Sequence, residues 1–167
     1  MARVVIALTL ILYVWVFPSF TKEWQGIVPC SSTRVDVERT FGKDSFGEPE
    51  GYGAYKYKGL RVTVDYYRAI EGHPDRDIVQ RIRVYTENAQ RLSQYARNIK
   101  NFSKNFLKTE VGLNDPHLAL SGYAVYRNWN DGFEIWVQKP GGGPEIIDSF
   151  GYFDPVWDCA KRTGAPR

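Results

Sequence analysis

Apolar and polar residues alternate on both sides of the dipeptide Lys58-Gly59, across residues 54–57 and 60–67. Alternation with a period of two is typical of β-strands with one buried face, and a glycine-containing pair between two such runs predicts a tight hairpin. A two-residue turn fixes the register, so the apolar residues of both strands share a face. The pairs predicted on this face are Tyr57 with Leu60 and Tyr55 with Val62.

A third alternating run, residues 78–85, predicts a neighbouring strand. Its apolar residues Ile78, Ile82 and Val84 belong to the buried face, which turns the residues between them to the other side. That second face therefore collects cationic and aromatic side chains. Its members in the first three strands are Arg61, Arg81, Arg83 and Tyr85.

Helical periodicity occurs twice. Thr33 and Asp36 have the spacing of a capping box, ahead of a short helix that ends at Gly42. A longer stripe, with spacings of three and four, predicts a second helix that ends at Gly112. The members of this stripe are Leu92, Tyr95, Ile99, Phe102 and Phe106.

The turn residues 130–132 predict a second hairpin, and residues 145–153 predict the last strand. A two-residue loop would place Trp129 and Glu134 on one face. A three-residue loop with Gly132 in the left-handed conformation is preferred, because it gathers apolar residues on one side. It pairs Trp129 with Phe133 and Val125 with Val137, and turns Trp136, Glu134 and Tyr126 outward.

Each half of the chain thus has the order helix, hairpin, strand. This order predicts an α+β protein of two helix-plus-three-stranded antiparallel units, with the helices on one side of the sheet. The halves share little residue identity, so a tandem pseudo-repeat and a coincidence of element order both stay open. We expect a leader at residues 1–20, the first unit at 21–88 and the second at 89–167.

The leader is predicted from an unbroken apolar run at residues 4–17, which follows Arg3. This is the pattern of a secretory signal, and the run is shorter than the about 20 residues that span a bilayer. The run lacks an A-x-A cleavage motif, so an uncleaved anchor is the alternative. We expect a secreted or periplasmic protein that meets the membrane only through such an anchor. In an oxidising compartment, Cys30 and Cys159 would form a disulfide, with two separate thiols as the alternative.

The chain carries 22 basic and 19 acidic residues. This balance lacks the concentrated basic footprint of a nucleic-acid-binding protein. His73 and His117 could join Asp75, Asp77 and Asp115 in a metal or general-base site, but no ligand signature matches their spacing and polar turns explain them. No catalytic signature is present, so we expect no catalytic residue, metal or cofactor.

The two ends of the chain carry a family resemblance. They resemble a group of uncharacterised secreted bacterial proteins, which implies a bacterial envelope or exterior location and no activity. At the level of the fold, one unit is similar to small outer-membrane-assembly lipoproteins, and two in tandem are similar to the β-lactamase inhibitor protein. The residues that carry the resemblance are Trp24 to Pro29, Ser32-Thr33, Asp36 to Glu38 and Gly42 at the start, and Tyr152 to Pro155 and Asp158-Cys159 at the end.

Trp, Tyr and Arg dominate binding hot spots, so the outward sheet face is the candidate binding site. We expect an exported, non-catalytic binding or accessory protein of the bacterial envelope or exterior, with an unidentified protein or an anionic ligand as its partner. The alternatives are a tandem-repeat inhibitor of a secreted enzyme and a small hydrolase with an unrecognised site; another segment covering the face would remove the binding site. The candidate residues are Arg61, Arg81, Arg83, Tyr85, Trp136 and Tyr126.

Overall fold

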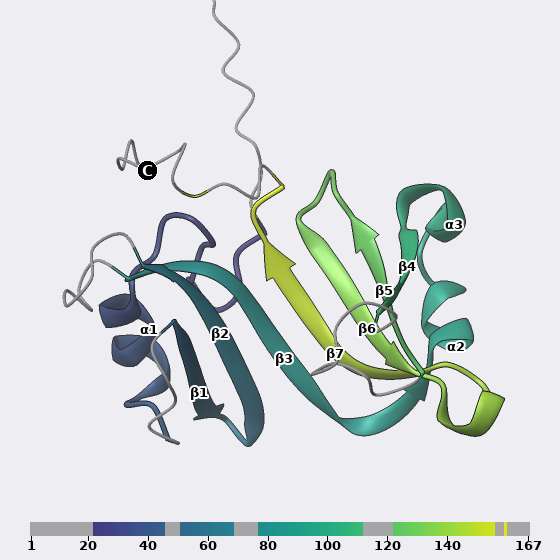
Figure 1. Ribbon diagram of the computed structural model, residues 1–167, viewed down its shortest axis with the longest axis horizontal. Coiled ribbons are helices and arrows are strands. Elements are labelled where there is room, and N and C mark those ends of the chain that lie inside the picture. Colours follow the sequence, from purple (N-terminus) through teal and green to yellow (C-terminus); the bar gives the residue numbers. More distant parts are fainter. Residues whose placement is uncertain (1–21, 46–50, 69–76, 112–121, 156–158, 160–167) are drawn as a thin grey trace, which may run out of the picture.

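The computed structural model describes residues 22–45, 51–68, 77–111, 122–155 and 159. Seven strands form one antiparallel sheet in the order β1-β2-β3-β7-β6-β5-β4 (Figure 1). The strands are β1 (Tyr52–Tyr57), β2 (Leu60–Arg68), β3 (Asp77–Arg91), β4 (Leu107–Val111), β5 (Tyr123–Asn128), β6 (Phe133–Gln138) and β7 (Ile146–Phe153). The helices are α1 (Arg34–Phe41), α2 (Leu92–Ala96), α3 (Phe102–Asn105) and the 3-10 helix η2 (Pro140–Gly142).

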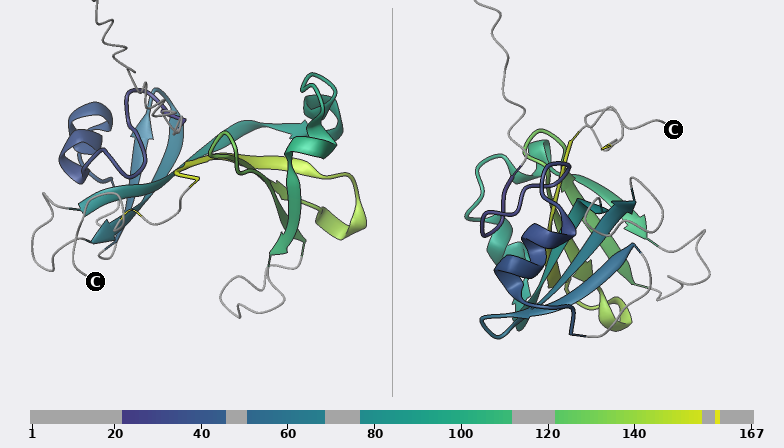
Figure 2. Two further views of the ribbon diagram at one scale, coloured as in Figure 1. Left: turned by 90° about the horizontal axis from the view of Figure 1, so that it is seen from above. Right: turned by 90° about the vertical axis from the view of Figure 1, so that its left-hand side faces the viewer.

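The expected pair of helix-plus-three-stranded units is wrong. β3 and β7 pair from Arg81 opposite Phe153 to Arg91 opposite Ile146, and this pairing joins the two halves into one sheet. Figure 2 shows the strong twist of this sheet between its β1 and β4 edges. Local patterns did not predict the single sheet, because β3 and β7 lie far apart in the sequence.

The first hairpin has the predicted register, with Tyr57 opposite Leu60 and Tyr55 opposite Val62. Lys58 and Gly59 both have positive φ angles, 49° and 88°, as a tight primed turn requires. The third strand departs from its prediction at a bulge, where the register shifts by one residue between Asp65 and Tyr66. Val79 therefore takes the buried place expected for Ile78, which is only half-buried.

The long helix predicted from the apolar stripe is also wrong. Asn101 has a φ of 57°, which separates α2 from α3, and Phe106 is already extended ahead of β4. The predicted end at Gly112 lies outside the described residues. The stripe still marks buried positions, because its five members all pack in one core cluster around Ile135 and Val137.

Two core clusters lie on the same face of the sheet. The first packs Val37 and Phe41 of α1 against Val62 and Ile82 of the sheet. The second packs the α2–α3 segment against β5, β6 and β7. Tyr152 contacts both clusters, so the hydrophobic layer is continuous across the β3–β7 junction.

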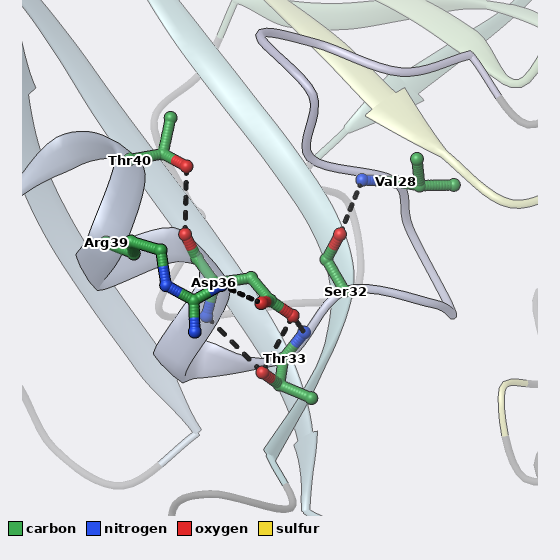
Figure 3. A network of polar contacts seen from close by, with 6 residues as sticks. All are labelled: Val28, Ser32, Thr33, Asp36, Arg39 and Thr40. Atoms are coloured by element: carbon green, nitrogen blue, oxygen red, sulfur yellow. Dashed lines mark hydrogen bonds and ion pairs between the residues drawn. The ribbon is translucent and has the colours of Figure 1, made fainter.

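The N-terminus of α1 has the predicted capping box (Figure 3). The Thr33 hydroxyl accepts a hydrogen bond from the Asp36 backbone N–H, and the Asp36 carboxylate accepts one from the Thr33 N–H at 2.9 Å. Asp36 also accepts a hydrogen bond from Arg39 at 3.1 Å. These contacts satisfy backbone donors that the first turn of a helix leaves free.

A disulfide joins Cys30 and Cys159, with their Cα atoms 4.9 Å apart, which confirms the expected pairing. The Cys30 backbone N–H donates to the Val79 carbonyl of β3 at 2.6 Å. The Cys159 sulfur also lies 3.9 Å from this carbonyl oxygen, so both cysteines contact the same residue of β3. Within the described ranges, no helix is long and apolar enough to cross a membrane.

Candidate functional site

The candidate site lies on the side of the sheet away from the helices. We call this side the helix-free face. Cross-strand pairs place its residues in register from β1 to β5, because alternate residues of a strand share one side. The residues that define the helix-free face are Lys56, Arg61, Thr63, Asp65, Arg81, Arg83, Tyr85, Arg127, Glu134, Trp136, Ser149 and Gly151.

Glu134 is the buried centre of this face, with 0% of its side chain exposed. Its carboxylate accepts a hydrogen bond from Arg127 Nε at 2.9 Å and another from the Trp136 indole N–H at 2.7 Å. Arg81 Nε lies 3.6 Å from Glu134 and 3.6 Å from Asp65. A buried carboxylate needs such partners, because an uncompensated charge in the interior is very costly.

Gly151 makes room for this carboxylate. A Cβ atom added at Gly151 would lie 2.4 Å from Glu134 Cγ and 2.6 Å from Glu134 Oε1. Glu134 and Gly151 are direct cross-strand partners on β6 and β7. The glycine is therefore part of the site, and it lets the glutamate side chain lie flat across the neighbouring strand.

Two arginines stack on aromatic rings instead of pairing with carboxylates. The guanidinium carbon of Arg83 lies 3.9 Å from the ring centroid of Trp136, and that of Arg61 lies 4.7 Å from the ring of Tyr85. Neither arginine has an ion pair with a residue that the structure describes. The buried Nε of Arg83 also lacks a hydrogen-bond partner there.

The structure brings five of the six candidate residues together on the helix-free face, but changes their roles. Trp136 is 7% exposed, so it lies beneath Arg83 and is no free aromatic anchor. Arg81 is engaged by Asp65 and Glu134. The accessible part of the site is formed by Arg61, which is exposed, and by Arg83 and Tyr85, which are half-buried.

Tyr126 lies on the opposite side of the sheet. The second hairpin pairs Asn128 with Phe133 and Tyr126 with Ile135, one residue out of the predicted register. Tyr126 packs against the second core cluster and donates its hydroxyl to Glu145 at 2.7 Å. Burial raises the pKa of Tyr126 to about 12, and the neighbouring Glu145 carboxylate adds to this shift.

The side chain of Asn128 accounts for the changed register. Its Oδ1 accepts hydrogen bonds from the backbone N–H groups of Asn130 and Asp131 at 3.1 and 3.2 Å, which closes an Asx turn over four loop residues. Gly132 has the expected left-handed φ of 61° within that longer loop. Sequence reasoning identified the turn and its glycine but missed the asparagine that sets the loop length.

Other candidate chemistry finds no support in the described part of the chain. His73, His117, Asp75 and Asp115 lie outside the described residues. Asp77 is buried in an ion pair with Arg34 at 3.1 Å. No group of metal-ligating side chains gathers anywhere in residues 22–45, 51–68, 77–111, 122–155 or 159.

Sequence reasoning also missed Arg127 and Gly151. Arg127 follows Tyr126 on β5, so the correct hairpin register, which turns Tyr126 toward the helices, would have placed Arg127 on the helix-free face. The role of Gly151 depends on a partner strand that no local pattern identifies.

Comparisons with known proteins give a fold and no function. The chain matches no protein-family model and no curated protein. It is similar to the crystal structure of a DUF4309 family protein, YjgB, from Bacillus subtilis, with a TM-score of 0.53 and 12% identity over 80% of this chain and 85% of that one. At this identity the similarity shows the fold alone. The resemblances to secreted bacterial proteins, assembly lipoproteins and the β-lactamase inhibitor protein stay predictions.

Proposed function

We propose that this chain is an exported, non-catalytic binding protein that takes a carboxylate-bearing partner on its helix-free face. The observation that carries this proposal is the pair of stacked arginines, Arg61 and Arg83, which have no ion pair among the described residues. A guanidinium that stacks on a ring keeps its planar edge of N–H donors available. That edge matches a carboxylate with two parallel hydrogen bonds.

The charge on this face supports the same proposal. Its members include five basic and two acidic residues, and both acidic ones already contact Arg81. Buried Glu134 contacts Arg81 and Trp136, which lie next to Arg83. These contacts hold the guanidinium donors of Arg83 on an ordered part of the sheet. Pre-organisation of this kind lowers the entropy lost on binding. The basic residues are Lys56, Arg61, Arg81, Arg83 and Arg127, and the acidic ones are Asp65 and Glu134.

Export is supported by the disulfide and the leader pattern together. The Cys30–Cys159 bond is of a kind that persists in oxidising compartments. The apolar run at residues 4–17 lies outside the described residues and contributes only its sequence pattern. An envelope or extracellular setting would present acidic proteins and polymers as partners.

Binding to immobilised poly-L-glutamate tests this proposal. The Arg61→Gln/Arg83→Gln variant should bind at least about tenfold more weakly, because two charged hydrogen-bond donors are removed. The matched control is Lys100→Gln/Lys104→Gln, which removes two exposed lysines near the helices and should bind as the wild type does. Equal binding by the Arg61/Arg83 variant and the wild type would contradict the proposal.

A further inference from the structure

Among the described residues, the C-terminal part of β3 has no neighbouring strand on its β2 side. β2 pairs with β3 only as far as Val62 opposite Val84, while β3 continues to Arg91. No described strand pairs with the β2 side of β3 beyond Val84. In Figure 1, β3 continues to the right beyond the β1–β2 hairpin toward α2. β3 bulges against β7 between Tyr85 and Gln90, and residues 87–91 are all exposed.

The sequence of this open edge is self-complementary. Antiparallel pairing of two copies about Ala89 places Glu87 opposite Arg91 of the second copy, and Asn88 opposite Gln90. If residues 87–91 are fully extended in that pairing, Glu87, Ala89 and Arg91 share one side of the paired strands, and the two amides share the other. Opposite charges in direct cross-strand pairs are stabilising. The small side chain of Ala89 meets its own copy at the two-fold axis.

A cleft runs along the same edge. Its volume is 550 Å³, and its lining combines the open strand with an apolar floor of Leu60, Val84 and Phe150. A pairing strand would satisfy the free backbone groups of this edge and cover the three apolar residues. We propose that this edge is a homodimer interface, in which a second copy of the chain adds its own residues 87–91 antiparallel to β3.

This interface does not depend on the proposed carboxylate-binding face. A two-fold axis at Ala89 gives an isologous contact that closes at two copies. The terminal edges of the sheet are β1 and β4. β4 carries Lys108 and Glu110, and Lys108 is already paired to Glu110 at 2.8 Å and to Glu145 at 2.9 Å. Charged side chains on an edge strand, Lys above all, disfavour its pairing with a strand of another copy. The proposed contact therefore uses β3 and leaves β4 exposed.

Charge reversal tests the proposal by analytical ultracentrifugation of the full mature chain over a concentration series. The wild type should dimerise, and Glu87→Lys or Arg91→Glu alone should weaken the dimer at least about tenfold, because each variant places like charges opposite one another. Mixing the two variants should restore dimers, since each copy then offers the charge that the other lacks. The double variant should dimerise with itself for the same reason.

Glu110→Lys on β4 is the matched control and should dimerise as the wild type does. Ala89→Cys gives a second readout, because residues directly opposite in an antiparallel pair have Cα atoms about 4.5–5.5 Å apart, within disulfide range. Oxidation should cross-link this variant across two copies with the Cys30–Cys159 bond intact. A wild type that stays monomeric at every concentration, or a dimer that neither single charge reversal weakens, would overturn the proposal.

Discussion

At the scale of single residues, the helix-free face is organised by one buried carboxylate. Glu134 is fully buried and contacts Arg81, Arg127 and Trp136. We expect Glu134→Gln to lower the free energy of unfolding by about 2–4 kcal/mol, because it leaves two arginines without their shared counter-charge. Urea denaturation with the disulfide intact measures this. Glu110→Gln, on an exposed edge, should change stability by no more than about 0.5 kcal/mol, and an equal effect of both variants would contradict this account.

Gly132 shows how closely two strand ends approach. It has a φ of 61°, and an added Cβ would lie 2.2 Å from the Phe153 carbonyl oxygen. Gly142 has a φ of 77° but faces open space. Gly142→Ala should cost about 1–2 kcal/mol from backbone strain, whereas Gly132→Ala should cost more because backbone atoms must also move. Equal thermal unfolding temperatures for the two variants would show that the hairpin end is looser than described.

At the scale of elements, short-range signals predicted well and register across longer loops did not. The Lys58-Gly59 turn and the Thr33–Asp36 capping box depend on neighbours in sequence, and both are confirmed. The α2–α3 stripe marked buried positions correctly but gave the wrong element, because a left-handed Asn101 and an extended Phe106 interrupt the helical spacing. Tyr126 was placed on the wrong face by a single-residue error in loop length.

The capping box makes a prediction about pH. Hydrogen bonds from the Thr33 backbone N–H and hydroxyl hold the pKa of Asp36 below its usual range. A lowered folded-state pKa means that ionised Asp36 stabilises α1 above the unfolded-state pKa of about 3.9, and that this contribution is lost as the pH falls through the folded-state pKa. Asp36→Ala should destabilise the protein by about 1 kcal/mol at pH 7. The difference from wild type should shrink below about pH 3 in a series of thermal melts. A difference that stays constant down to that pH would contradict the assigned role.

At the scale of the whole molecule, the decisive contacts join distant parts of the sequence. The β3–β7 pairing creates the single sheet. It places Arg83 of β3 opposite Gly151 of β7, which in turn lies opposite Glu134 of β6, next to Trp136 on the same face. Alternation within β3 predicted that Arg81 and Arg83 lie on the face of the sheet away from Ile82 and Val84. The pattern within β3 did not show that Glu134 and Trp136 of β6 would lie against these two arginines. The exposure of this face was therefore overestimated from the sequence.

The disulfide is the second long-range tie. It closes a loop with a sequence separation of 129, so its removal should restore much conformational freedom to the unfolded chain. Cys30→Ser/Cys159→Ser should lower the free energy of unfolding by about 4–5 kcal/mol in the chain-entropy description. Denaturation curves of this variant and the oxidised wild type test the expectation. Coincident curves would show that the bond adds no stability.

The central claim is that Arg61 and Arg83 present free donors for a carboxylate on the helix-free face. The most direct test is an NMR titration of the oxidised protein with poly-L-glutamate, following the arginine Nε–H, tryptophan indole and lysine side-chain signals. We predict that the Arg83 and Arg61 Nε–H signals and the Trp136 indole signal shift together and saturate, while Lys100 and Lys104 on the helix side stay unchanged. Shifts confined to the helix-side lysines, or no shift at the arginines up to saturation of the polymer, would contradict the account.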